Sequence, residues 1–158
     1  MSRSILILCQ DNNEVTFQEI MQFIKDGYYF DEQPEFEIHE DRIIIHYDLD
    51  VRPITIEIFT DSKIVEEIKQ ERYEVVTDNI KKSSVSNDEE LTSKILSRVM
   101  ASKNIYRIEF SYDDLSEDCW GMKAAVESFL ATEKKGLILA DEGIYDSNLK
   151  LIVSFWVL

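Results

Sequence analysis

Residues 35–47 read EFEIHEDRIIIHY, two runs of alternating apolar and polar residues on either side of the pair Glu40-Asp41. Alternation with a period of two is typical of a strand that buries one face, and a two-residue connection is typical of a β-hairpin. With this turn, the cross-strand neighbours are Ile38 with Ile43 and Phe36 with Ile45. We therefore expect an antiparallel hairpin in which these four side chains share the buried face.

The rest of the chain divides into runs of two kinds. Short apolar or alternating runs predict strands, and apolar residues three and four positions apart predict helices. The expected strands cover residues 5–9, 35–39, 42–47, 54–59, 106–110, 137–140 and 149–157. The expected helices cover residues 16–27, 61–75, 86–102 and 116–136.

Several signals mark the ends of these helices. Thr16 with Glu19, and Ser86 with Glu89, have the spacing of a capping box at a helix N-terminus. Gly136 is of a residue type that commonly ends a helix. The polar stretch 77–87 is expected to be a loop.

This order of elements predicts a single α+β domain over residues 1–158. Its sheet should be mostly antiparallel or mixed, with about seven strands accompanied by about four helices. The chain has possible halves at 1–60 and 106–158, with a helical insertion at 61–105.

The halves suggest an internal repeat, because residues 5–48 and 106–157 both run strand, acidic turn, helix, strand, strand. If this βαββ repeat is real, the acidic turns at Asp11 and at Asp113-Asp114 are equivalent and concentrate negative charge on one region of the surface. Since βαββ units are common, chance similarity is the alternative.

The charge of the chain is strongly negative and unevenly spread. There are 32 acidic and 17 basic residues, a formal net charge of −15. Residues 1–60 and 106–158 carry nearly all of this excess, whereas residues 61–105 are close to balance. Such a field attracts basic surfaces and repels nucleic acids and anionic membranes. The expected partner is a basic protein, with no direct nucleic-acid binding and no membrane association, since no apolar run approaches about 20 residues.

No sequence pattern indicates a catalytic centre. The chain has no GxSxG elbow, and its four scattered glycines cannot form a phosphate-binding loop. His39 and His46 lie on the outer face of the hairpin, where a solvent-facing pair of His46 with Glu35 is preferred over a general base. Cys9 and Cys119 lack CxxC or zinc-ligand spacing and are expected to be buried thiols of a cytoplasmic protein. We expect no enzyme activity, no catalytic residues and no cofactor.

Two segments, 28–35 and 112–120, combine aromatic and acidic residues, a mixture suited to the recognition of a basic protein surface. The acidic stretch 141–146 adds a third group of carboxylates. The predicted partner-binding residues are Tyr28, Tyr29, Asp31, Glu32, Glu35, Asp113, Asp114, Glu117, Asp118, Asp141, Glu142 and Asp146.

The same segments have other conceivable roles. Tyr29, Phe30 and Trp120 can pack in the core while the acids keep the surface soluble. The acids of 113–118 and 141–146 are also the best candidates for a divalent cation, but the first group is interrupted by an apolar residue and the second lacks EF-hand spacing. We therefore predict partner binding and no metal site.

Residues 135–146, KGLILADEGIYD, are similar to a strand-turn-strand ending of some bacterial toxin-immunity proteins. This resemblance is accompanied by the small size, the acidic composition and the lack of catalytic motifs. It implies stoichiometric inhibition, in which a carboxylate-rich face covers the basic cleft of a cognate toxin or nuclease domain.

Other functions stay open at this point: a phage-type anti-defence inhibitor or DNA mimic, a divalent-metal-dependent enzyme, and a structural subunit of a larger complex. The apolar ending 149–158 is either a buried central strand or an edge strand that pairs with a second copy, so a homodimer also stays open.

Overall fold

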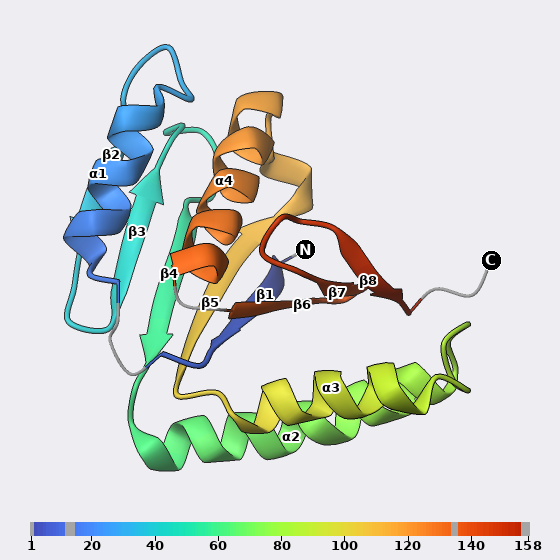
Figure 1. Cartoon of the computed structure of the whole chain (residues 1–158). Coiled ribbons are helices and arrows are strands. Elements are labelled where there is room, and N and C mark those ends of the chain that lie inside the picture. Colours follow the sequence, from blue (N-terminus) through green and yellow to red (C-terminus); the bar gives the residue numbers. More distant parts are fainter. Residues whose placement is uncertain (1, 12–14, 134–135, 156–158) are drawn as a thin grey trace.

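An antiparallel sheet of eight strands forms the centre of the protein, in the order β2-β3-β4-β5-β1-β6-β7-β8 (Figure 1). The computed structural model describes residues 2–11, 15–133 and 136–155. The strands are β1 (Ser2–Cys9), β2 (Glu35–Ile38), β3 (Arg42–His46), β4 (Ile54–Phe59), β5 (Asn104–Ser111), β6 (Gly136–Ala140), β7 (Gly143–Tyr145) and β8 (Leu151–Ser154). The helices are α1 (Phe17–Gly27), α2 (Ser62–Lys81), α3 (Glu89–Met100) and α4 (Glu117–Glu133), with a 3-10 turn at Tyr112–Asp114. The fold class is α+β, as the sequence predicts.

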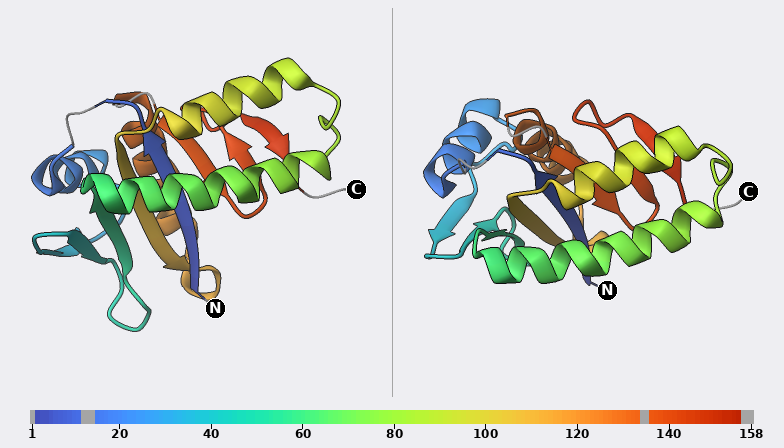
Figure 2. Two further views of the ribbon diagram at one scale, coloured as in Figure 1. Left: turned by 90° about the horizontal axis from the view of Figure 1, so that it is seen from below. Right: turned by 60° about the horizontal axis from the view of Figure 1, so that its bottom comes forward.

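Helices cover both faces of this sheet (Figures 1 and 2). α1 and α4 pack on one face, against residues such as Ile5 and Ile7 of β1. The antiparallel pair α2 and α3 packs on the other face, against Leu6 and Leu8 of the same strand. Because a central strand is buried on both faces, it reads in sequence as an unbroken apolar run.

The predicted hairpin of β2 and β3 is confirmed in its register. Ile38 pairs with Ile43 and Phe36 with Ile45, and the N–H of His39 donates to the carbonyl of Arg42 across the turn. Ile43 and Ile45 are fully buried. The expectation of burial is wrong for Ile38, which is 36% exposed. β2 is an edge strand of the sheet, and an edge strand is only partly covered.

The strand count exceeds the prediction by one. β7 occupies part of the stretch 141–146, which we expected to be an acidic connection. A strand of three residues is too short for its alternation to be recognised. The strand expected at 149–157 is β8, an edge strand; Trp156 and Val157 lie outside the described residues.

The end of α2 and the start of α3 also differ from expectation. α2 continues to Lys81, through the first part of the predicted loop at 77–87, because Val76 and Ile80 are buried against the sheet side. α3 begins after Asp88, whose carboxylate accepts a hydrogen bond from the N–H of Leu91, and not after Ser86.

The first helix start is confirmed and the last helix end is wrong. Thr16 and Glu19 form the predicted capping box. Gly136 does not cap α4 but is the first residue of β6. A Cβ at Gly136 would lie 3.0 Å from the Cα of Ala131, so glycine allows β6 and α4 to approach closely.

The proposed repeat exists in the order of elements but not in their placement. β1-α1-β2-β3 and β5-α4-β6-β7 have the same order of elements. In the sheet, however, β2 lies at an outer edge, far from β1, whereas β6 lies directly beside β1 and is followed outward by β7. β1 and β5 are antiparallel neighbours, with Ser2 opposite Ser111. The acidic turns that follow them, at Asp11 and at Asp113-Asp114, therefore lie at opposite ends of the sheet. The expectation that the repeat brings them together is wrong.

Candidate partner-binding surface

The two predicted acid-and-aromatic segments meet at one end of the sheet. Because neighbouring strands are antiparallel, the starts of β2 and β4 lie at this end of the sheet together with the ends of β3 and β5. The connections 28–35, 46–53 and 111–118 consequently lie together, at the top of Figure 1. We call these three segments the acidic end.

Tyr47 joins the three segments. Its ring stacks on Phe30, with 5.9 Å between centroids, and its hydroxyl donates to the carbonyl of Asp114 at 3.1 Å. The N–H of Arg52 donates to the carboxylate of the same Asp114 at 3.3 Å. Burial raises the pKa of Tyr47, so its hydroxyl remains protonated and able to donate. The sequence pattern does not identify Tyr47 as part of this surface, because its partners are remote in the chain.

The charge of the acidic end is almost entirely of one sign. Its only Lys or Arg is Arg52, against nine acids: Asp31, Glu32, Glu35, Asp48, Asp50, Asp113, Asp114, Glu117 and Asp118. Within the described residues, the carboxylates of six of them make no hydrogen bond or ion pair: Asp31, Glu32, Glu35, Asp50, Glu117 and Asp118. Glu117 and Asp118 have a local role, because they lie in the first turn of α4, where the helix dipole favours them. The carboxylates of Asp31, Glu32, Glu35 and Asp50 have no such local role within the described residues.

Tyr28 is the most exposed aromatic residue among the described side chains of this surface. It ends α1 with φ 48° and ψ 48°, in the left-handed region that favours glycine. Its side chain is 79% exposed, so burial does not offset the strain. A non-glycine residue in this conformation costs about 1–2 kcal/mol. Tyr28 is therefore unfavourable for the fold and accessible to a partner.

The other aromatic residues divide between core and surface. Tyr29 is half-buried beside Phe23, and burial raises its pKa. Phe30 packs on Tyr47. Trp120 packs by an edge on Phe110 but remains 40% exposed. The side chain of Tyr112 lies outside the described part of the structure.

The third predicted group of carboxylates is not part of this cluster. Asp141 forms an ion pair of 2.7 Å with Arg3, and Glu142 accepts a hydrogen bond from the hydroxyl of Tyr145 at 3.2 Å. Both lie in the turn between β6 and β7, at the same end of the sheet but beyond β1. Asp146 lies at the other end of β7, where its carboxylate accepts the backbone N–H groups of two residues of its own turn.

A hollow of about 490 Å³ opens beside Tyr47. Glu32, Glu35, Asp48 and Asp50 lie around it, together with Leu49, which is 90% exposed. The hollow thus combines an apolar side chain with several carboxylates, a composition that accepts the stem and the charged head of a lysine or arginine.

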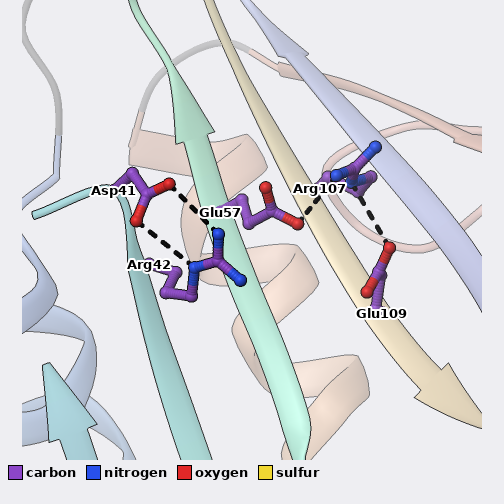
Figure 3. Close-up of polar contacts among 5 residues, drawn as sticks. All are labelled: Asp41, Arg42, Glu57, Arg107 and Glu109. Carbon is purple, nitrogen blue, oxygen red and sulfur yellow. Dashed lines mark hydrogen bonds and ion pairs between the residues drawn. The ribbon is translucent and has the colours of Figure 1, made fainter. Parts of the chain in front are cut away.

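A second group of charges lies on the α2 side of the sheet and was not predicted (Figure 3). Arg42 faces Glu57, and Glu57 faces Arg107, across β3, β4 and β5. Asp41 accepts two hydrogen bonds from Arg42, which lowers the pKa of that carboxyl. Arg107 lies 2.8 Å from Glu57 and 3.6 Å from Glu109. The sequence contains a signal for this group, because Glu57 alternates with the buried Ile56 and so must lie on the opposite face of the strand.

The histidines and cysteines occupy structural positions. His46 is opposite Glu35, as predicted, and its Nε2 lies 3.4 Å from Glu37. Cys9 and Cys119 are buried, and neither forms a disulfide. Burial raises the pKa of Cys119 to about 11, which opposes formation of a nucleophilic thiolate.

Two further features of the described residues concern metal binding and membrane spans. No group of three or more His, Cys, Asp or Glu residues among them is placed to hold a metal ion. No helix in the same part of the chain is both long and apolar enough to cross a membrane.

Comparisons with known proteins provide no relative from which to transfer a function. No protein-family model matches the chain, and neither the curated proteins nor the solved structures contain a match. A functional assignment therefore depends on the residues of this chain.

Proposed function

We propose that this protein binds a basic surface of another protein through the acidic end, and that it acts as an inhibitor of the immunity-protein kind. In this role it would cover the active site of a cognate basic toxin or nuclease domain. The observation that carries the proposal is the gathering of nine acids and the exposed Tyr28 at one end of the sheet, with Arg52 as the only Lys or Arg.

Electrostatics supports this proposal. Like charges placed together destabilise a fold, and they accelerate association with a partner of opposite charge. Several exposed carboxylates here have no partner within the described chain, so their desolvation can be compensated only by cations that come from outside.

The conformation of Tyr28 supports it in a different way. Tyrosine is enriched at protein interfaces, because it buries a large ring and still offers a hydrogen bond. An exposed tyrosine in a left-handed conformation gains nothing within the monomer. Burial of the ring by a partner would compensate the strain.

The test is co-expression with the product of a neighbouring toxin-like gene. We expect a stoichiometric complex, relief of toxicity, and an association rate that falls as salt is raised. The triple variant D31N/E32Q/E35Q should associate more slowly and with a weaker salt dependence. The variant E67Q/E74Q/D78N removes the same charge from exposed positions on α2 and should behave as the unmodified protein.

Other outcomes would contradict the proposal. A complex that leaves the partner's activity intact would indicate a structural subunit. Displacement of the partner by duplex DNA would indicate a DNA mimic. Heat of binding with Mg²⁺, Ca²⁺ or Mn²⁺ in calorimetry, without any protein partner, would favour a metal-dependent enzyme.

A further inference from the structure

A cavity of about 420 Å³ lies between α2 and the sheet, and none of its lining residues belongs to the three segments of the acidic end. Its volume is in the range of small-molecule sites, about 300–1,000 Å³. One part of its lining is apolar and includes Leu6, Phe59, Val75, Leu139 and Phe155. The other part is polar: Ser4, Glu71, Arg72, Asn79, Arg107 and Asp141.

Two arginines face this cavity from different elements, Arg72 from α2 and Arg107 from β5. The Nε atom of each is buried and makes no hydrogen bond within the described residues, although Nε of Arg107 lies 3.6 Å from the carboxylate of Glu109 in an ion pair. No other buried side-chain nitrogen or oxygen in that part of the chain lacks a partner. An unsatisfied buried donor is unfavourable, and such exceptions often mark functional sites.

The two arginines are held to different degrees. Arg107 is fixed between Glu57 and Glu109 (Figure 3). It also lies over the ring of Phe59, 5.2 Å from the ring centroid. Within the described residues, the only hydrogen bond or ion pair of the Arg72 side chain is with Glu71, at 3.4 Å, and the side chain of Glu71 is 65% exposed. Arg107 is therefore part of the wall, whereas the guanidinium of Arg72 can exchange Glu71 for another acceptor.

We propose that this cavity binds a small organic monocarboxylate, whose carboxylate replaces Glu71 on Arg72 and whose apolar body lies against Phe59, Val75 and Phe155. A planar guanidinium pairs well with a carboxylate. A dianion such as phosphate fits less well, because Glu71 and Asp141 in the lining and the two acids on Arg107 limit the positive charge.

The test uses hexanoate and benzoate as probes, followed by backbone NMR of the full chain and by calorimetry. We expect saturable shifts at cavity residues in the millimolar range that small fragments reach. The neutral hexanamide and benzamide should bind at least about tenfold more weakly, since a charge-assisted bond is lost. No shifts with either carboxylate, or equal shifts with the amides, would overturn the proposal.

Two variants decide which residue holds the carboxylate. R72Q should weaken binding about tenfold or more, whereas E71Q should strengthen it, because Glu71 competes for the same guanidinium. K94Q, which removes an exposed lysine paired to Glu90 on α3, is the matched control and should leave binding unchanged. Weaker binding of hexanoate in E71Q would contradict the exchange of Glu71 for the carboxylate of the ligand, and tighter binding of inorganic phosphate than of hexanoate would show that the monocarboxylate assignment is wrong.

Discussion

The acidic end and the row of charges on the α2 side of the sheet use the same residue types in opposite ways. At the acidic end, nine acids accompany one arginine, and six carboxylates have no partner within the described residues. In the row, Asp41, Arg42, Glu57, Arg107 and Glu109 alternate in sign; Arg42 pairs with Asp41, and Arg107 pairs with Glu57 and Glu109 (Figure 3). Alternating charges satisfy each other across strands, and they account for their own presence through the fold. Unpaired charges of one sign do not stabilise the fold in this way, so we propose that the acidic end is the part that binds a partner.

The largest effect is expected at Lys123 and Glu127 on α4, which form the most buried ion pair among the described residues. We expect K123M to lower the free energy of unfolding by about 3–5 kcal/mol near neutral pH, because it leaves a buried carboxyl without its cation. Urea unfolding followed by circular dichroism measures the loss. The double variant K123M/E127L should be close to the unmodified protein. An equal loss in both variants would show that the contacts of the Lys123 ammonium with the rings of Phe110 and Trp120 are the cause.

The pH dependence of K123M carries a definite sign. Burial already raises the pKa of Glu127, and loss of the cation raises it further. A raised carboxyl pKa means that the folded state holds a proton that the unfolded state has released, so stability falls as pH rises from the ordinary glutamate range through the raised pKa. The destabilisation by K123M should therefore shrink toward about pH 4–5; the same loss at acidic and neutral pH would contradict the assignment.

The paired row provides the next largest effect. R107Q leaves Glu57, whose side chain is 12% exposed, without its ion pair. We expect a loss of about 1–3 kcal/mol in the free energy of unfolding, measured by urea titration. The control R42Q removes an arginine that pairs with the exposed Asp41 and should leave stability close to the unmodified protein. Equal losses would mean that the row acts as one cooperative network.

Tyr28 should show the opposite behaviour, in which a substitution stabilises the fold and impairs function. Y28G removes the strain of a left-handed tyrosine, so we expect the free energy of unfolding to rise by about 0.5–1 kcal/mol while partner binding weakens. Leu149 offers a matched comparison, because its φ is 62° and it packs against the core. L149G should give no such gain, since relief of strain is offset by lost packing. A similar gain in both variants would contradict the argument that Tyr28, unlike Leu149, lacks packing that offsets its strain.

The smallest effect concerns the stability of the acidic end itself. D31N/E32Q/E35Q reduces repulsion among exposed carboxylates, so it should raise the midpoint of thermal unfolding slightly at low salt. The gain should vanish at high salt, because screening already weakens the repulsion. Thermal scans at two salt concentrations test this, with E67Q/E74Q/D78N as the control in the nearly balanced part of the chain. A loss of stability in the first variant would mean that these acids support the fold.

Local patterns were sufficient for most of the elements. The alternation in 35–47 predicts the hairpin and its register, and Thr16 with Glu19 predicts the start of α1. These features depend on residues that are only a few positions apart, so the sequence alone is enough to predict them. The short β7 and the extension of α2 to Lys81 were missed because burial against remote elements stabilises them.

By itself, the sequence determined the two acid-and-aromatic segments, the net charge and the α+β class, because composition and periodicity are properties of the chain. Only the tertiary structure decided that 28–35 and 111–118 lie together, that Tyr47 joins them, and that Asp146 stays apart. It also decided that Arg72 and Arg107 line one cavity. The physical reason is the order and direction in which the strands pair, because that order determines which connections share an end of the sheet and no local pattern specifies it.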